Sequence, residues 1–394
     1  MRNYAQLAVR LNIRNKHSYS IALTVEEKLT SFFMKIGIIG LPSSGKTTIF
    51  NALTRGKAET GGFGAPRSAN VGVAHVPDDR VDILTDIFKS KKKIYAEVTY
   101  VDIPGSSSGD MFTGEAITHL QQVDAILHVA RAFEDASVPH TEGAIDYKRD
   151  IEKAAFDILF ADIALIENRI ERIGANLKAL KASERDEAVK NIESLKQIQV
   201  DLENGIAFRD RTLNPSQKRA ISDTFTLSSL PLLFAVNIGE SDIVSTDSME
   251  QELDELLPGK YTGAAVICGS LEAELVDMPL EEEIEMRSGL NAGESGLWRM
   301  IKLSYRVLGL SSFLTVGEDE TRAWTIINGT LAPKAAGVIH SDIERGFIRA
   351  ETITYADFMD CGTMTEARNR GLLRQEGREY VVQDGDIVNF LFSV

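Results

Sequence analysis

The sequence predicts an α/β protein with a mostly parallel sheet, an inserted antiparallel helical hairpin and a smaller C-terminal α+β domain. Three observations predict this fold class. A phosphate-binding motif, Gly40–Thr47, lies between a strand-like and a helix-like segment. Apolar residues recur at steps of three and four between positions 151 and 202, as in two packed helices. Residues 309–394 contain several short strand candidates and a single helical stretch.

The loop motif is G-x-x-x-x-G-K-[ST], flanked by a strand at Lys35–Ile39 and a helix at Thr47–Leu53. Its glycines let the backbone turn tightly, so that successive N–H groups can point at phosphate oxygens. Lys46 adds a positive charge, Thr47 offers a hydroxyl to Mg²⁺, and the helix presents its positive dipole end. We therefore expect a nucleoside triphosphate here, with Lys46 as the catalytic residue and Thr47 as a metal ligand. The residues expected around the phosphates are Leu41, Pro42, Ser43, Ser44, Gly45, Lys46, Thr47 and Thr48. The alternative, an accidental glycine-rich turn, does not explain the order of strand, loop and helix.

Composition limits the possible classes of function. The chain has 394 residues, 43% hydrophobic and 26% charged, which is ordinary for a globular protein of two or three domains. The net charge of −15 means that nucleic-acid contact would need a local basic surface. The two cysteines, Cys268 and Cys361, are too few for a disulfide framework or a zinc site, and they fit a reducing cytosol. No apolar run is long enough to span a membrane, so no membrane partner is expected.

Residues 1–33 need a separate explanation, because Met34 immediately precedes the first predicted strand. Their apolar stretch, Ile21–Leu23, is too short for a secretory core, and Glu26 and Glu27 depart from a transit-peptide pattern. We expect a peripheral extension, or an upstream start codon, rather than a targeting segment.

A second phosphate-side motif follows the strand-like segment Tyr95–Val101. It reads Asp102-Ile103-Pro104-Gly105, a D-x-x-G arrangement. In nucleotide switches this aspartate helps to hold Mg²⁺, and the glycine N–H contacts the γ-phosphate. A D-x-x-G turn alone is common, so the interpretation depends on its place after a strand and after the loop. It predicts Asp102 as a metal ligand and Gly105 as a nucleotide-binding residue.

The base side is predicted from two further strand ends. The apolar segment Leu230–Val236 ends in Asn-Ile-Gly-Glu at positions 237–240, where guanine-specific switches carry N-K-x-D. The lysine that would lie over the base is absent and the acidic side chain is one methylene longer, so we expect guanine selectivity to be weakened or lost. A second strand, Ala264–Ile267, runs into a turn of small residues. The predicted base-side residues are Asn237, Ile238, Glu240, Cys268, Gly269 and Ser270. A capped turn is the alternative role for Asn237 and Glu240.

Two amphipathic stripes predict the hairpin. The first consists of Ile151, Ala155, Ile158, Ile166, Ile170, Ile173, Leu177 and Leu180, and it is interrupted by Asp162. Residues 182–185 break the pattern, which then resumes with Val189, Ile192, Leu195, Ile198 and Leu202. We expect the stripes to be packing surfaces. The charges near the tip, Lys178, Lys181, Arg185 and Lys190, are expected to form a solvated face.

Together these motifs resemble the Obg-like ATPase (YchF) family of P-loop NTPases. The most specific similarity is C-terminal, where Arg322–Ile326, Ala335–His340, Glu344–Glu351 and Tyr380–Asp386 resemble the family's TGS domain, a β-grasp. The resemblance covers nearly all of residues 34–394. It implies a G domain at 34–147 and 213–308, the hairpin at 148–212 and a TGS-like domain at 309–394, after the extension at 1–33. It also implies ATP in preference to GTP, slow hydrolysis, Mg²⁺, a cytoplasmic location and association with the ribosome or ribosomal RNA. We expect a monomer with no DNA partner.

Basic residues give a weaker indication of RNA contact. A candidate RNA-facing patch in the C-terminal region consists of Arg322, Lys334, Arg345, Arg349, Arg374 and Arg378, but interleaved acidic residues favour a mixed surface. The densest basic run, at positions 89–93, is expected to be a solvated loop, with ribosomal RNA contact as the alternative. His340 lies among apolar residues, so we expect it to be packed rather than a ligand.

Two departures from the family pattern concern hydrolysis. Pro66 stands where the family carries a threonine that closes over Mg²⁺ and the γ-phosphate, and Thr60 and Ser68 are out of register with it. Ser106, in a shortened segment after Gly105, stands where the family carries a hydrophobic residue. Three classes therefore stay open: a slow ATPase switch, an ATP-sensing protein with little or no hydrolysis, and a less favoured GTPase or small-molecule kinase. No arginine-rich lid or acceptor pocket supports the kinase.

Overall fold

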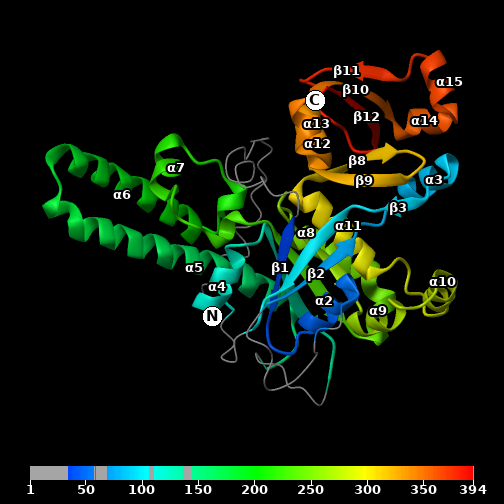
Figure 1. Ribbon diagram of the computed structural model, residues 1–394. Coiled ribbons are helices and arrows are strands. Elements are labelled where there is room, and N and C mark those ends of the chain that lie inside the picture. The colour runs from blue at the N-terminus through cyan, green and yellow to red at the C-terminus, as the bar shows by residue number, and fades with distance from the viewer. Residues whose placement is uncertain (1–33, 57, 59–68, 106–110, 136–142, 394) are drawn as a thin grey trace.

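The computed structural model describes residues 34–56, 58, 69–105, 111–135 and 143–393, and these residues form two six-stranded sheets. Figure 1 shows the first sheet at the centre, the second above it, and a pair of long helices that projects to one side. Within the described residues, no helix has both the length and the apolar composition needed to cross a bilayer. This architecture confirms the predicted α/β class with a second, C-terminal sheet domain.

The first sheet has the strand order β2-β4-β1-β5-β6-β7. Every neighbouring pair is parallel except β2 and β4, which are antiparallel. The strands are β1 (Lys35–Gly40), β2 (Asn70–His75), β4 (Glu97–Asp102), β5 (Ala125–Ala132), β6 (Leu232–Ile238) and β7 (Thr262–Ile267). β1, β5 and β6 are almost wholly apolar and buried, as parallel strands are when helices cover both faces.

Helices cover both faces of this sheet. One face packs on α2 (Lys46–Thr54) and α11 (Gly296–Leu308), whereas α3 (Asp79–Phe88) packs on the second sheet. The other face packs on α4 (Gly114–Leu120), the start of α5 (Tyr147–Asn176) and α8 (Thr246–Leu256). Two short helices, α9 (Gly269–Leu275) and α10 (Leu280–Gly289), follow β7. The carboxyl ends of β1, β4, β5 and β6 consequently meet at one edge of a fully covered sheet, where α/β folds bind ligands.

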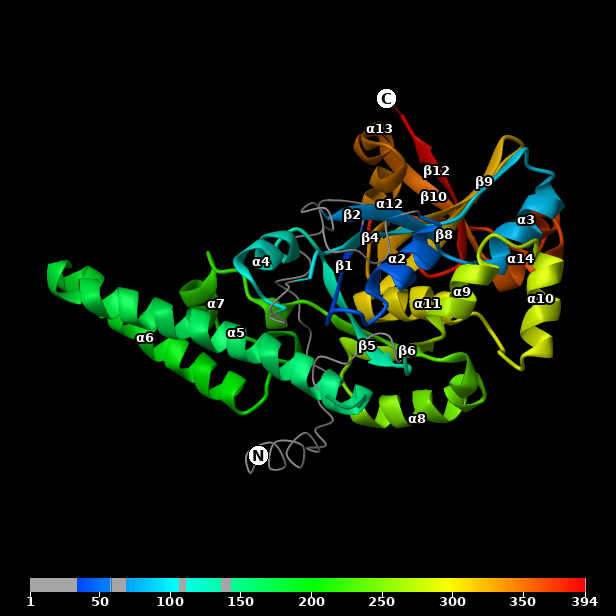
Figure 2. The same cartoon turned by 90° about the horizontal axis from the view of Figure 1, so that it is seen from below.

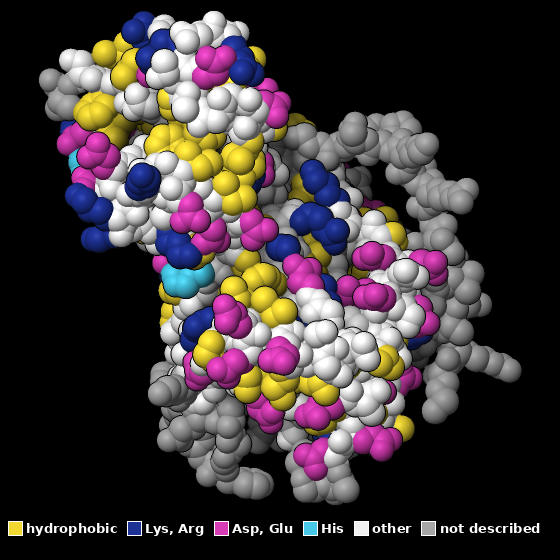
Figure 3. All heavy atoms as spheres, turned by 90° about the vertical axis from the view of Figure 1, so that its right-hand side faces the viewer, with side chains coloured by type: hydrophobic (Ala, Val, Ile, Leu, Met, Phe, Trp, Pro, Cys, Tyr) yellow, Lys and Arg dark blue, Asp and Glu magenta, His cyan; other side chains and the backbone are white. Residues whose placement is uncertain are grey.

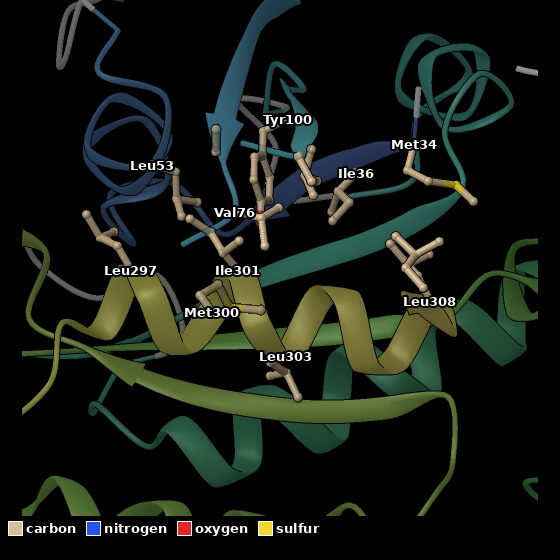
Figure 4. Packing of buried hydrophobic residues seen from close by; sticks show 14 of the residues in the cluster. Met34, Ile36, Leu53, Val76, Tyr100, Leu297, Met300, Ile301, Leu303 and Leu308 are labelled. Atoms are coloured by element: carbon tan, nitrogen blue, oxygen red, sulfur yellow. The ribbon is translucent and has the colours of Figure 1, made fainter. Parts of the chain in front are cut away.

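The helix α11 shows how the sequence determines this packing. Its apolar residues recur at steps of three and four, so they form one stripe. In Figure 4, Met300 and Ile301 point toward Tyr100 of the sheet. The phenol oxygen of Tyr100 lies 3.1 Å from Ser304 Oγ, so this buried hydroxyl has a hydrogen-bond partner. The helix ends at Gly309, which adopts the left-handed conformation with φ 66°.

One buried residue in the core of the first sheet is a histidine. His128 of β5 is 1% exposed and stacks edge-on against Phe234, with 5.7 Å between ring centroids. Neither ring nitrogen has a hydrogen-bond partner among the described residues. Burial, with a smaller effect of Lys153, lowers the pKa of His128 to about 4. The imidazole is therefore neutral at physiological pH and acts as a packing group.

The predicted hairpin is present as α5 and the antiparallel helix α6 (Ala182–Glu203), with α7 (Pro215–Ile221) packed on α6. Figures 1 and 2 both show it projecting away from the two sheets. The break lies at Leu177–Lys181, so the expectation of a break at 182–185 is wrong. Arg185 belongs to the first turn of α6 and donates to the carbonyl oxygens of Leu177 (3.1 Å) and Leu180 (3.3 Å). It therefore caps the end of the preceding helical segment, while Lys178, Lys181 and Lys190 are exposed.

Asp162, the polar interruption in the stripe, fastens the hairpin to the sheet. It is 1% exposed, and its carboxylate accepts the backbone N–H groups of Leu227 (2.9 Å) and Ser228 (2.8 Å). Burial raises the pKa of Asp162, and these hydrogen bonds and the nearby Arg209 oppose that rise. Because the turn at Leu227–Ser229 leads into β6, this contact fixes the strand that carries Asn237.

The second sheet has the strand order β11-β10-β12-β8-β9-β3. Its C-terminal strands are β8 (Leu310–Val316), β9 (Glu320–Ile327), β10 (Phe347–Thr354), β11 (Arg374–Glu376) and β12 (Asp386–Phe392). The expectation of one helical stretch is wrong, because the described C-terminal residues contain α12 (Ala332–Ile339), α13 (Ser341–Arg345), α14 (Tyr355–Cys361) and α15 (Met364–Asn369). The expectation of a packed His340 is also wrong. Its side chain is 62% exposed, and its Nδ1 accepts the Asp342 N–H at the start of α13.

The sixth strand of this sheet comes from the first domain. β3 (Lys92–Ile94) pairs in parallel with β9, with Lys92 opposite Glu320 and Ile94 opposite Arg322. Lys92 and Lys93 therefore belong to a strand rather than to a solvated loop, whereas Lys89 and Lys91 lie exposed in the turn before it, as expected. Two lysines of the run form ion pairs: Lys91 with Asp319 (2.8 Å) and Lys93 with Asp82 (2.6 Å). These pairs leave less free positive charge for an RNA contact.

The two domains also share an apolar core. Phe88 of α3 stacks on Phe358 of α14, with 5.4 Å between ring centroids. Arg80 donates to Asp78 and, across the domain boundary, to Asp384 at 2.8 Å. The C-terminal domain is thus joined to the first by strand pairing, stacking and an ion pair.

The proposed RNA-facing patch is mixed in charge. Lys334 pairs with Glu344 (2.6 Å), Arg345 pairs with Asp342, and Arg378 donates to the backbone oxygen of Phe347. On the face in Figure 3, acidic and basic side chains are likewise interleaved over both domains.

Candidate functional site

The phosphate-binding motif forms a loop between β1 and α2, as its sequence predicts. Gly45 adopts φ 86°, and a Cβ added to it would lie 2.1 Å from Asn237 Nδ2. Glycine is strongly favoured there, because the left-handed backbone strains a residue with a Cβ and that Cβ would displace the Asn237 side chain. Pro42 and Ser43 are exposed, while Leu41 and Ser44 are buried. Ser44 Oγ has no hydrogen-bond partner among the described residues.

Lys46 and Thr47 converge on Asp102 at the end of β4. Lys46 Nζ lies 3.4 Å from Asp102 Oδ1 and donates to the Ile103 carbonyl oxygen at 3.0 Å. Thr47 Oγ1 donates to Asp102 Oδ2 at 3.1 Å. The lysine and aspartate side chains are only 14% and 7% exposed, so this charge pair is sheltered from solvent. A Cβ on Gly105 would lie 3.9 Å from Lys46 Nζ, which places Gly105 on the same side of the loop.

These residues fit a magnesium ion. Mg²⁺ prefers hard oxygen ligands and is usually bound through one or two protein groups together with water and phosphate oxygens. The Thr47 hydroxyl and the Asp102 carboxylate are such ligands and already lie in contact. Within the described ranges, no cluster of three or more His, Cys, Asp or Glu side chains offers a complete protein cage. The arrangement therefore suits an ion held jointly with phosphate.

The residues predicted for the base side meet around Asn237, which is 4% exposed. Its Nδ2 donates to the Ser44 carbonyl oxygen (3.0 Å), and its Oδ1 accepts the Gly269 N–H (3.0 Å). Asn237 thus links the phosphate loop to the start of α9. Cys268 and Gly269 are buried there, and the expected turn is the first turn of a helix.

Glu240 and Ile238 differ in what they expose. Glu240 is exposed, and its Oε1 lies 3.5 Å from Ser270 Oγ, at the mouth of the base side. Ile238 is 3% exposed and packs in the core, so its side chain has little surface to offer a ligand. Thr48, in the first turn of α2, is half-buried.

Comparison with known proteins gives matches across most of the chain. Residues 35–168 match the family model described as 50S ribosome-binding GTPase, and residues 310–393 match the C-terminal model of YchF GTPases, described as a protein of unknown function. The ribosome-binding ATPase YchF of Bacillus subtilis is 38% identical over 91% of this chain and 99% of its own length. The chain belongs to the YchF family. Obg-like ATPase 1 of Gallus gallus, also similar, is 36% identical over 91% of this chain and 92% of its own length. The solved structure of the Schizosaccharomyces pombe YchF GTPase has a TM-score of 0.76 at 30% identity, covering 91% of this chain and 97% of its own.

Sequence reasoning missed one aromatic residue at the site of this YchF-family chain. Phe133 follows β5, and its ring atoms come within 3.8 Å of the position that a Gly45 Cβ would occupy. The Arg131 guanidinium lies 4.6 Å from the centre of the Phe133 ring, and Arg131 Nε donates to the Phe133 carbonyl oxygen. Its position in the sequence could have indicated it, because Phe133 follows a parallel strand whose carboxyl end lies beside the phosphate-binding loop.

The two departures from the family pattern lie outside the described residues. Pro66, with its neighbours Thr60 and Ser68, and Ser106 all belong to segments that the structure does not describe. Their consequences for hydrolysis stay predictions from the sequence.

Proposed function

We propose that this chain is a nucleotide-dependent switch that binds ATP in preference to GTP, hydrolyses it slowly and acts with the ribosome. The observation that carries the base preference is the composition of the segment 237–240. Asn237 keeps the bridging position between the loop and α9, whereas the lysine and aspartate of a guanine site are replaced by a buried isoleucine and an exposed glutamate. A side chain that must accept two guanine N–H groups needs a fixed carboxylate, and Glu240 makes only a long contact with Ser270.

The phosphate side supports triphosphate binding through the residues of this chain. Lys46 is held between Asp102 and the Ile103 carbonyl oxygen, so its ammonium group is already positioned beside the loop. A γ-phosphate arriving there would replace contacts with Asp102 by stronger contacts with phosphate oxygens. Thr47 and Asp102 would hold Mg²⁺, which neutralises the charge that develops on the phosphates when it is bound. Backbone N–H groups at the start of α2 add the positive end of a helix dipole.

Slow hydrolysis is inferred from the residue after Gly105. Ser106 stands where guanine switches carry the glutamine that orients the attacking water. Without such a group, positioning of the water is poor and the chemical step is slow. The proposal that the chain acts with the ribosome rests on relatives that are named ribosome-binding ATPases. The similarity to this chain covers nearly the whole length of these relatives. We also infer that the C-terminal sheet domain is of the TGS type, and that the protein is cytoplasmic.

The base preference is tested by calorimetry of the wild-type protein with ATP and with GTP. ATP should bind more tightly, and the double variant Ile238→Lys/Glu240→Asp should shift the preference toward GTP. Lys46→Ala is the control that should lose both nucleotides. Tighter GTP binding by the wild type would overturn the base assignment, which matters because relatives carry both ATPase and GTPase names.

Hydrolysis is tested by phosphate release with and without purified ribosomes. A slow rate that ribosomes change would support the switch. The second candidate is an ATP-sensing protein with little or no hydrolysis, and Pro66 and Ser106 favour it. Tight ATP binding with no phosphate release under either condition would select that candidate, whereas phosphate transfer to a small molecule would select a kinase.

A further inference from the structure

A buried carboxylate lies directly behind the base side. Glu272, in the first turn of α9, is 3% exposed and is three residues from Gly269, which donates to Asn237. Its oxygens accept four hydrogen bonds. The donors are Arg287 Nη1 (3.0 Å), Arg287 Nη2 (2.7 Å), Ser295 Oγ (2.8 Å) and the Gly296 N–H (2.8 Å). Glu272 is thus fully satisfied, and its position is fixed from two directions.

The donors come from two elements outside α9. Ser295 and Gly296 begin α11, and Gly296 packs so closely on β7 that an added Cβ would lie 3.0 Å from the Val266 carbonyl oxygen. Arg299 of α11 also donates to that carbonyl oxygen, at 2.9 Å. Cys268 lies between the end of β7 and the start of α9. Glu272 joins the start of α9 to α11, and α11 in turn contacts the end of β7.

Arg287 is held by this ion pair rather than by apolar packing. It is the only buried residue of α10, whose apolar side chains Leu280 and Ile284 are 59% and 58% exposed. Burial lowers the pKa of Arg287, and its bonds to Glu272 and Glu283 more than offset this, so the pKa is raised. A buried ion pair contributes little net stability compared with apolar residues of similar size, although breaking one partner is costly. Stability alone therefore does not explain why a charge pair occupies this place.

We propose that Glu272, held by Arg287 and Ser295, is a positioning residue for recognition of the nucleotide base, because it fixes the contact of the Gly269 N–H with Asn237 and the place of the Ser270 hydroxyl. This inference rests on the proposed ATP site. The contact between Gly269 and Asn237 depends on where α9 begins, and Asn237 in turn holds the Ser44 carbonyl oxygen. Loss of the Glu272 contacts would release the start of α9 and change base affinity while leaving Lys46, Thr47 and Asp102 in place.

The test compares three variants by calorimetry with ATP, GTP and inorganic tripolyphosphate, which probes the phosphate side alone. Glu272→Gln keeps the shape but removes the charge, and we expect ATP affinity to fall about tenfold. Arg287→Lys keeps the charge but loses the paired geometry, so its loss should be smaller. The matched control is Glu283→Gln, because Glu283 also bonds to Arg287 (2.8 Å) but does not contact Glu272. It should bind ATP as the wild type does, and tripolyphosphate affinity should be unchanged in all three.

The outcomes separate this inference from the proposed function. Equal losses for ATP and tripolyphosphate, or lowered thermal stability with unchanged ATP affinity, would show a merely structural role and overturn the inference alone. If Glu272→Gln does not fold, Ser295→Ala removes one of the four hydrogen bonds and should give the same selective loss in weaker form. If the wild type binds no ATP, or binds ATP no better than tripolyphosphate, the proposed base site fails and the inference fails with it.

Discussion

Replacement of Gly45 by alanine should damage both the fold and the nucleotide site, for two separable reasons. The first is the backbone, because Gly45 has φ 86°, a left-handed conformation that costs a residue with a Cβ about 1–2 kcal/mol. The second is the neighbour, because the new Cβ would lie 2.1 Å from Asn237 Nδ2. Asn237 must then move and give up its hydrogen bond to the Ser44 carbonyl oxygen, which costs about 1–2 kcal/mol more. We expect Gly45→Ala to lower the free energy of unfolding by about 2–4 kcal/mol.

Two controls isolate the contribution of Asn237. Gly362→Ala has a similar backbone cost, since Gly362 has φ 73°, but no atom lies within 4 Å of its added Cβ. In an Asn237→Ala background, Gly45→Ala should likewise cost only the backbone term. Urea unfolding measures the stabilities, and calorimetry should show at least a tenfold loss of ATP affinity for Gly45→Ala. The reasoning is refuted if Gly45→Ala costs no more than Gly362→Ala, or costs the same with and without the Asn237 side chain.

Three further predictions concern the core and the domain boundary. Below pH 6.5 the unfolded chain protonates His128 while the folded imidazole stays neutral to about pH 4, so wild-type stability should fall by up to about 3 kcal/mol across that window. Urea unfolding at a series of pH values measures the stability of both proteins, and His128→Leu should lack this loss. If the stabilities of the wild type and the variant fell in parallel with pH, the lowered pKa of His128 would be contradicted. Asp162→Asn should cost about 1–3 kcal/mol by urea unfolding, because one of two buried N–H groups loses its acceptor. An unchanged midpoint would show that water replaces the carboxylate. Arg80→Met should cost about 1 kcal/mol and raise hydrogen exchange in β9 more than in β5, whereas equal exchange would argue against a boundary role for Asp384.

Much of the phosphate side could be predicted because its signals are local. The fixed spacing of Gly45, Lys46 and Thr47, and the position of Asp102 after an alternating strand, depend on a few neighbouring residues. The structure adds that Asp102 contacts both Lys46 and Thr47. That contact also follows from a rule readable in the sequence, since parallel strands end at one edge of the sheet.

The rest could not be predicted because it depends on partners far away in the chain or on very short elements. A three-residue strand such as β3 has no period to detect, and its partner β9 is recognised only in space. Helices α13 and α15 are five and six residues long, so their caps at His340 and Thr363 outweigh any apolar pattern. The role of Glu272 was equally hidden, because its four hydrogen bonds involve residues 15–24 positions away.

The pairing of β3 with β9 has a consequence for the order in which the chain is made. Lys91 meets Asp319, 228 residues later in the sequence. At about 5–20 residues per second, synthesis leaves this strand without its partner for roughly 10–45 s. An unpaired strand edge invites pairing with other chains, and lysines on such an edge discourage it. The basic run at 89–93 is therefore suited to keep the first domain from associating with its neighbours until the last domain has emerged.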